Sequence, residues 1–315
     1  MAEYLDIEGR SVPQPQYKGN ATKLVDEYKR AMRDIQSYLL RIDLNNFQRA
    51  NALVTLKQIE KRLKELDLFA ADWVKASIPE AAFDGTAATL VNLGLAATLV
   101  EAKDIVKFNQ LNTAMIELYI ERTNEDILAI TNNIRKQVRN TIREVSGEVM
   151  RQQMAKGVNG IETQNRLILQ GLRDKLGDSV EKVILDAGKN RWNPSDYVDM
   201  LTRSVQLETY RQAQTNEAVA RGANYGIISY AGAKDACRFH EGRIIKLVPQ
   251  AEGSYPTYDE LKASNQIFHP RCRHHFTVFK NFDRLSDSVR ESAEKQHERG
   301  NAALAAGGRN PKDIE

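Results

Sequence analysis

The sequence has very few cysteines, and it has no long apolar run. Two cysteines among 315 residues cannot form a disulfide framework, which argues against a small secreted scaffold and favours a reducing compartment. The most apolar stretch, TAATLVNLGLAATLV at residues 86–100, is too short to span a bilayer, and Asn92 and Gly94 interrupt it. We interpret it as a buried helix. Aromatic residues make up only 7% of the chain, which is little for an all-β domain.

A large excess of charge of one sign is also missing. Lysine and arginine number 45 against 42 acidic residues, for a net charge of +3. Any contact with nucleic acid must therefore come from a local patch rather than from the whole molecule. The first twenty residues, MAEYLDIEGRSVPQPQYKGN, lack the basic segment and apolar run of a secretory signal. With 42% hydrophobic and 28% charged residues, the composition indicates a soluble and mostly helical protein.

Helical periodicity dominates the first half of the chain. Apolar residues recur at spacings of three and four from residue 21 to about residue 75. Ser77-Ile78-Pro79 predicts a break, because proline does not continue a helix, and Gly85 predicts a turn. Residues 86–155 predict two further helices that end at Gly157 and Gly160. A pattern of this length indicates helical hairpins or a bundle.

Three shorter helical segments are predicted next, from IETQNRLILQGLRDKLG, SVEKVILDAGKN and the segment that follows Asn193. The last has Asn193 or Ser195 as a cap, Pro194 early and Gly222 at its end. Beyond Gly222 the runs YGIISYAG, GRIIKLV and HHFTVFK predict short strands. PTYDELKAS is either one helix or a loop. Residues 284–298 predict a polar helix, and the Gly/Ala-rich tail after it is predicted to be disordered.

The predicted fold class is therefore mainly α: long helical hairpins or a bundle, followed by a small α+β module. We divide the chain into an extended arm at 1–20, a helical domain at 21–160, a helical connecting region at 161–223, a small α+β Cys/His module at 224–283, and a polar helix with a disordered tail at 284–315.

Both cysteines and four of the five histidines lie in two short segments, KDACRFHEGRII at 234–245 and IFHPRCRHHF at 267–276. Cys237 and His240 are three positions apart, and His269 and Cys272 repeat the spacing in the opposite order. Two ligands at this spacing in a tight turn can reach one zinc ion, which takes four nitrogen or sulfur ligands in a tetrahedron. A module of this size has little core of its own, so a bound metal would stabilise it.

The residues alone leave the ligand set open. We expect structural zinc on Cys237, His240 and Cys272 with either His269 or His274, and His275 stands next to them. Other interpretations remain: buried apolar cysteines, one disulfide, or histidines that serve only as hydrogen-bonded core groups.

The run TYRQAQTNEAVARGANYGIISYAGAKDACRFHEGRIIKL, followed by FHPRCRHHF, resembles the C-terminal domain of phage head morphogenesis proteins, the minor capsid proteins of the Mu F type. The resemblance covers about residues 205–280. The matching positions are Cys237, Gly242, His269, Pro270, Cys272 and Arg273. Two cysteines of the family pattern are His240 and His274 here. Because histidine replaces cysteine as a zinc ligand but not in a disulfide, the resemblance points to Cys237, His240, Cys272 and His274 as ligands.

The resemblance also implies a function. Proteins of this kind are low-copy components of the capsid interior, made in the host cytoplasm, which bind the portal and other capsid components during assembly. Several copies per particle are expected, without a membrane in the mature capsid. Some act on packaged DNA or on its delivery into the host. The resemblance implies no enzymatic activity.

One basic row is a candidate for non-specific contact with double-stranded DNA. Arg135, Arg139 and Arg143 are four residues apart and share one helical face, which suits a phosphate backbone. The alternatives are a solvated helix face or ion pairs with acids of a neighbouring helix. A second basic segment contains Arg271 and Arg273.

The same residues are compatible with two functions other than a capsid role. The first is a metal-dependent hydrolase or nuclease that uses His269, His274 or His275, with Glu241 or Asp235 as the base. A metal with four protein ligands would leave no position for water, which argues against it. The second is a nucleic-acid-binding regulator with a zinc-finger-like module, which the near-neutral charge disfavours.

Overall fold

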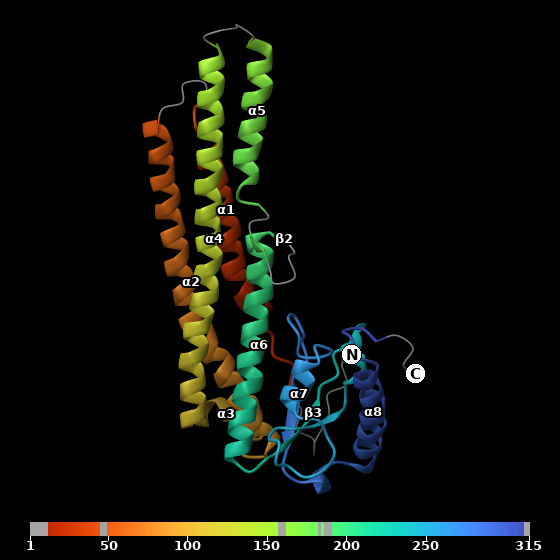
Figure 1. Cartoon of the computed structure of the whole chain (residues 1–315). Helices are drawn as coiled ribbons and strands as arrows, with labels where there is room; N and C mark the ends of the chain where they lie inside the picture. Colours follow the sequence, from red (N-terminus) through yellow and green to blue (C-terminus); the bar gives the residue numbers. More distant parts are fainter. Residues whose placement is uncertain (1–11, 45–48, 157–161, 182–183, 186–190, 312–315) are drawn as a thin grey trace. The chain divides into compact units, whose positions relative to one another are not determined.

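The computed structural model describes residues 12–44, 49–156, 162–181, 184–185 and 191–311. Within these ranges the chain forms eight α-helices, and a small three-stranded antiparallel sheet lies near the C-terminus (Figure 1). This confirms the predicted fold class. The chain divides into two compact units, one of residues 18–75 and 121–201, and the other of residues 1–17, 76–120 and 202–315. No helix of the described residues is long and apolar enough to cross a membrane.

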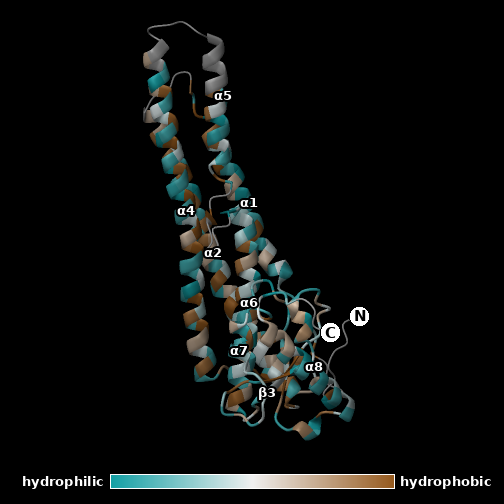
Figure 2. Cartoon of the chain, turned by 45° about the vertical axis from the view of Figure 1, so that its right-hand side comes forward, coloured by the Kyte–Doolittle hydropathy of each residue, from teal (hydrophilic) through white to brown (hydrophobic). Residues whose placement is uncertain are grey.

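The unit of residues 18–75 and 121–201 is built from long helices. It contains α1 (Lys18–Leu40), the first part of α2 (Arg49–Asn92), most of α4 (Gln110–Lys156) and α5 (Glu162–Asp178). Hydrophobic and hydrophilic residues alternate along α1 and α4, as expected for helices with one buried face (Figure 2). The buried residues of α4 recur at three and four: Ile127, Ile130, Ile134, Val138, Ile142, Val145 and Val149.

One helix predicted in this unit is wrong. Within SVEKVILDAGKN the structure has the short strand β1 (Ile184–Leu185), which pairs antiparallel with β2 (Arg191–Trp192). The segment contains Val180, Val183 and Ile184, and β-branched residues favour strands over helices.

Helix α2 continues through the proline where a break was predicted. Pro79 lies inside the helix, and Val74, Ile78 and Ala82 are buried on either side of it. Burial of this continuous apolar face offsets the one backbone hydrogen bond that proline cannot donate. The turn predicted at Gly85 is also wrong. A Cβ at this position would lie 2.2 Å from the carbonyl oxygen of Tyr210, so the glycine lets two helices approach closely.

The other unit contains α3 (Leu99–Ile105) and most of α6 (Pro194–Ala220). The predicted limits of α6 are confirmed. The side chain of Asn193 accepts a hydrogen bond from the backbone nitrogen of Ser195, and Gly222 has the positive φ of 75° that ends many helices.

The three predicted strands of the C-terminal module are confirmed as β3 (Tyr225–Ile228), β4 (Ile244–Lys246) and β5 (Phe276–Phe279), in the order β4-β3-β5. Helix α7 (Tyr258–Ala263) settles the open choice between helix and loop, and its capping box of Thr257 and Glu260 explains where it begins. Short 3₁₀ helices η1 (Ala236–Phe239) and η2 (Phe282–Arg284) follow β3 and β5.

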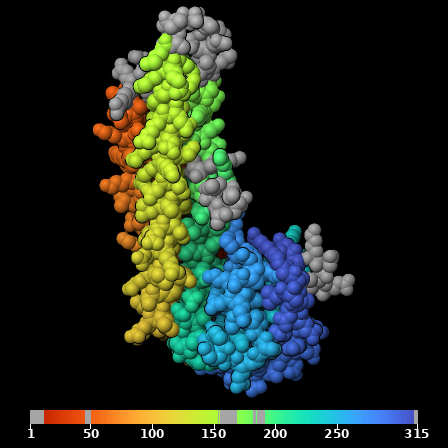
Figure 3. All heavy atoms as spheres, viewed as in Figure 1, coloured from red at the N-terminus to blue at the C-terminus, as the bar shows by residue number. Residues whose placement is uncertain are grey.

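The polar helix is longer than predicted. Helix α8 is Asp287–Ala306, and it lies against the rest of the C-terminal module (Figure 3). The predicted disorder is wrong for residues 300–311, because this segment packs on the module. The side chain of Gln266 donates to the carbonyl oxygens of Ala303 and Gly308, and Asn310 accepts from the backbone nitrogen of Ala236. Residues 312–315 lie outside the described residues.

The predicted N-terminal arm is only partly described, since residues 1–11 lie outside the described ranges. The described part packs against its own unit. Tyr17 is buried with its ring edge-on to that of Tyr210, at 6.5 Å between centroids, and Gln14 donates to the backbone oxygen of Arg273. The arm gives way to α1 at Lys18.

Candidate metal centre

Two loops of the C-terminal module bring the predicted ligands together. Strands β3 and β5 are antiparallel, with Ile228 opposite Phe276, so the chain leaving β3 and the chain entering β5 lie at the same edge of the sheet. The first loop continues into η1, which carries Cys237. The second carries His269, Cys272 and His274. The antiparallel register therefore brings together residues more than thirty positions apart in the sequence.

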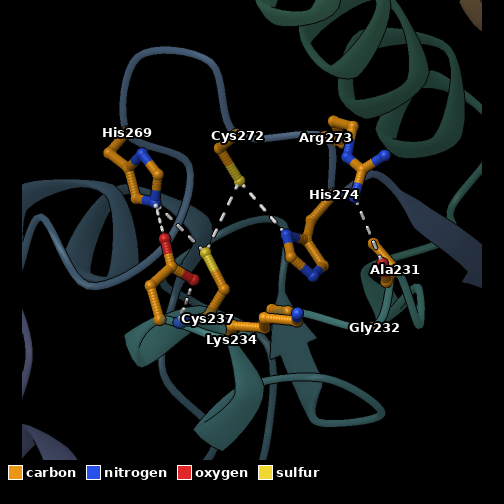
Figure 4. A pocket seen from close by; sticks show the side chains of 10 residues that line it. Ala231, Gly232, Lys234, Cys237, His269, Cys272, Arg273 and His274 are labelled. Carbon is orange, nitrogen blue, oxygen red and sulfur yellow. Dashed lines mark hydrogen bonds and ion pairs between the residues drawn. The ribbon is translucent and has the colours of Figure 1, made fainter.

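Local hydrogen bonds shape both loops. Asp235 caps η1 by accepting from the backbone nitrogen of Cys237 at 3.2 Å. In the second loop the backbone nitrogen of Cys272 donates to the carbonyl oxygen of His269 at 2.9 Å, which closes a tight turn. Arg271 within this turn has a φ of 64°. The turn directs the side chains of His269 and Cys272 toward Cys237 (Figure 4).

Three donor atoms are spaced as a zinc site requires, and a fourth, of His274, lies beside one of them. The sulfurs of Cys237 and Cys272 are 3.9 Å apart, His269 Nε2 is 3.3 Å from the first sulfur, and His274 Nδ1 is 3.2 Å from the second (Figure 4). Zn–S bonds of about 2.3 Å and Zn–N bonds of about 2.0–2.1 Å place tetrahedral ligand atoms ~3.3–3.8 Å apart. The ligand atoms of Cys237, His269 and Cys272 all lie within 4.8 Å of one another. Both cysteines are free thiols.

Each of the two histidines is oriented through its other ring nitrogen. His274 Nε2 lies 2.9 Å from Glu241 Oε1, which also accepts from the backbone nitrogens of Ala231 and Ala233. His269 Nδ1 lies 2.9 Å from the carbonyl oxygen of Pro270. Metal-bound histidines usually donate their second ring N–H to a carboxylate or a backbone oxygen in this way.

Asp235 competes for one of the donors. Its Oδ2 lies 3.1 Å from His269 Nε2, the nitrogen that faces the sulfur of Cys237. Since this nitrogen cannot hold a proton and a metal together, the ion pair with Asp235 and coordination exclude each other. Metal binding would therefore release Asp235 from His269.

His240 and His275 are not part of the cluster. His240 is fully buried, with Nε2 3.0 Å from Gln266 Oε1 and Nδ1 3.4 Å from Arg243 Nη1. Burial lowers its pKa to about 4, and burial lowers the pKa of His275 to about 3, so both rings are neutral at pH 7. The structure thus places His269, not His240, beside the two cysteines and His274. His240 ends η1, where its ring faces Gln266 instead of the sulfurs.

The thiols are electrostatically unequal. The hydrogen bond between the two thiols lowers the pKa of Cys272, and the contact with His274 lowers it further. The same hydrogen bond and burial raise the pKa of Cys237. Burial opposes the protonation of His274, but Cys272 and Glu241 outweigh it and raise its pKa to about 9. The lowered pKa of Cys272 favours its thiolate, the form of cysteine that binds zinc.

Helix α6 holds the second loop through side chains that the sequence did not single out. Arg211 donates to the carbonyl oxygen of His274 at 2.9 Å, and Ser204 accepts from the backbone nitrogen of Arg271 at 3.0 Å. The guanidinium of Arg211 is buried, pairs with Glu208 and lies 5.0 Å from the ring centroid of Phe268.

The arginine row predicted to contact DNA lies in the helical unit of residues 18–75 and 121–201. Arg135 pairs with Glu60 and Asp67, and Arg139 also pairs with Glu60. Arg143 is exposed. Two of the three guanidiniums are therefore neutralised by acids of α2, which is the alternative that the sequence left open.

The family of the chain follows from a comparison with family models. The model described as phage minor capsid protein 2 matches residues 20–309, so the likeness extends well beyond the C-terminal module. No curated protein and no solved structure matches the chain. A capsid family carries a role in head morphogenesis, a place in the virion and contacts with other capsid components. The chain belongs to the phage minor capsid protein 2 family and is a capsid protein of a phage head.

Proposed function

We propose that this protein is a structural component of the capsid interior that binds the portal, and that one Zn²⁺ on Cys237, His269, Cys272 and His274 staples its C-terminal module. The observation that carries the metal proposal is that donor atoms of Cys237, His269 and Cys272, from two loops, lie within 4.8 Å of one another, with His274 Nδ1 3.2 Å from the sulfur of Cys272. The proposal of portal binding rests on family membership and on the resemblance of residues 205–280.

A metal supplies what the module lacks. Its sheet has only three short strands, and residues 229–243 and 264–275 contain no regular element except η1. Zinc would link these two loops directly and give the two buried thiols a partner. Because four protein ligands fill the tetrahedron, such a site is structural and leaves no position for a reactive water.

The same geometry supports a role that is not enzymatic. Glu241, a candidate base, accepts three hydrogen bonds, from His274, Ala231 and Ala233. Asp235 accepts from the backbone nitrogen of Cys237 as the cap of η1, and a site with four protein ligands holds no water for it to activate. Nuclease or peptidase turnover that disappears in a correctly folded His269→Ala variant would overturn this part of the proposal.

Elemental analysis tests the metal. The purified full chain should contain one zinc per chain, and Cys237→Ser should lose the zinc together with several degrees of Tm. Ser288→Ala, a change in the exposed start of α8, serves as the control and should retain both. A wild-type chain that folds with zinc present, contains no metal and keeps its Tm in a chelator would overturn the staple.

Co-expression tests the partner and the location. The protein should co-purify with the portal protein encoded by the same phage, and in intact virions it should resist added protease until the capsid is opened. Failure to co-purify would overturn portal binding, and rapid digestion in intact virions would overturn the interior location. Neither result depends on the metal content.

A further inference from the structure

A cavity of about 360 Å³ lies directly over the two sulfurs. One wall is the loop that follows β3, with Gly232 and Lys234, and the other wall is the loop that precedes β5, with Arg273. Figure 4 shows the long side chains of Lys234 and Arg273 on either side of His274. The cavity is therefore open to a ligand from outside and is bordered by two cations.

The walls exclude an apolar ligand. The only apolar side chains that line the cavity, besides those of the two cysteines, are the methyl groups of Ala231 and Ala233. Asp235 is the one carboxylate in the lining, and it accepts from the backbone nitrogen of Cys237. With zinc neutralised by two thiolates, Lys234 and Arg273 outnumber this single carboxylate and leave a net positive charge, which favours an anion.

The cations near the cavity differ from two arginines of the long helices in having no acidic partner in the described part of the chain. Lys234, Arg238 and Arg273 have no carboxylate partner among the described residues, whereas Arg135 and Arg139 are neutralised by Glu60. Arg238 is exposed, donates to the carbonyl oxygen of Lys234 at 2.8 Å and lies 4.4 Å from the ring centroid of Phe239. Those contacts hold Arg238 next to Lys234, although Arg238 itself does not line the cavity.

We propose that this cavity binds a phosphate group of a nucleic-acid backbone, between Lys234 and Arg273, with Arg238 beside the next phosphate. A guanidinium and an ammonium group together suit a tetrahedral oxyanion. A third cation outside the cavity continues the positive charge along the surface, as a polyanion requires and a single small anion does not. This inference rests on the proposed location inside the capsid, where packaged DNA is the polyanion present.

Binding of a labelled duplex of random sequence to the zinc-loaded full chain, followed by fluorescence anisotropy over a range of salt concentrations, tests the proposal. The double variant Lys234→Gln/Arg273→Gln should weaken binding at least tenfold and lower the slope of log K against log salt by about 0.9, since the two side chains together hold one phosphate and each phosphate contact contributes about 0.9. The control Lys280→Gln/Lys295→Gln removes the same charge from exposed positions of the same unit and should leave the slope nearly unchanged.

Two competitors identify the ligand. Inorganic phosphate should weaken binding of the duplex to the wild-type chain, and a poly-glutamate peptide of equal charge should compete poorly. The proposal is overturned if the wild-type chain does not bind the duplex, if both double variants lose affinity equally, or if poly-glutamate binds as tightly as DNA. Zinc content and Tm, measured for every variant, report separately on the metal staple, and the portal and protease experiments report separately on the location.

Discussion

The sulfur of Cys237 lies 3.9 Å from the sulfur of Cys272, although 35 positions separate the two residues in the sequence. The antiparallel pairing of β3 with β5 produces this distance, because it places the loops that carry the two cysteines at one edge of the sheet. The distance is close to the edge of a zinc tetrahedron, ~3.8 Å for two sulfurs. The sheet register and the proposed metal site are thus consequences of one pairing.

Replacement of His269 and of His240, one at a time, distinguishes the ligand sets. His269→Ala should lose the zinc, because it removes a donor 3.3 Å from Cys237. His240→Ala should keep the zinc, since the ring of His240 faces Gln266, but it should lower the free energy of unfolding by about 1–3 kcal/mol because Gln266 loses its partner. Zinc content and urea unfolding of both variants check this. Zinc loss in His240→Ala, with retention in His269→Ala, would restore the ligand set inferred from the family pattern.

Glu241→Gln tests the outer hydrogen bond of the proposed site. The neutral amide can still contact His274, but it no longer has the negative charge that keeps the ring proton on Nε2 and leaves Nδ1, which faces Cys272, free to bind the metal. The affinity for zinc should fall by about 10–100-fold, as is usual when such a partner of a metal-bound histidine is changed. Competition with a chromophoric chelator measures the affinity. Glu252→Gln, on an exposed loop, is the control. Equal affinities of all three proteins would contradict the orienting role.

The buried His240 predicts a loss of stability in weak acid. Burial holds its pKa at about 4, below the ordinary value of 6.5. Between these two pH values the unfolded chain binds a proton that the folded chain does not, so the free energy of unfolding decreases as pH falls, by at most ~1.4 kcal/mol per pH unit. The stability that the neutral ring of His240 contributes is fully present above pH 6.5, and its loss is complete below about pH 4.

Urea unfolding of the metal-free protein between pH 7.5 and 4.5 measures this effect. Metal-free protein is required because acid also removes zinc from its ligands. His240→Gln keeps a polar group beside Gln266 but does not titrate, so its stability should fall less steeply with pH. Parallel curves for the two proteins would show that His240 is not the titrating group.

Two glycines inside helices should respond oppositely to alanine. A Cβ at Gly85 would lie 2.2 Å from the carbonyl oxygen of Tyr210, so Gly85→Ala should destabilise the protein by about 1–3 kcal/mol. Gly171, on α5, has no atom within 4 Å of the added Cβ, so Gly171→Ala should stabilise it by about 0.5–1 kcal/mol. Thermal and urea unfolding measure both changes. Equal effects at the two positions would contradict the close approach at Gly85.

Local signals made a good part of the fold predictable from the sequence. The start of α6 at Asn193 and its end at Gly222 depend on a side chain and a backbone conformation within a few residues of the helix end. The three strands of the module lie where short β-rich runs stand between glycines. Capping residues and glycines act on neighbouring backbone groups, so the sequence contains all the information that these predictions use.

Other elements depended on distant contacts. Pro79 is tolerated within α2 because its neighbours are buried, and residues 300–311 are ordered because Gln266 and Ala236 bind them. Nothing in the sequence next to Pro79 or next to residue 300 indicates these interactions. The acids that neutralise Arg135 lie on a different helix, which is why the sequence could not decide between a DNA-binding row and an ion-pair row.

The sequence by itself determined the helical class, the capsid-type motif and the small set of residues from which any metal site must be drawn, because these follow from periodicity and from the identity of rare side chains. Only the tertiary structure decided which histidines face the sulfurs. His240 and His269 have the same spacing from a cysteine, but a 3₁₀ helix turns one ring toward Gln266 while a tight turn directs the other toward Cys237. The direction of a side chain depends on backbone conformation and packing, which the spacing of residues does not specify.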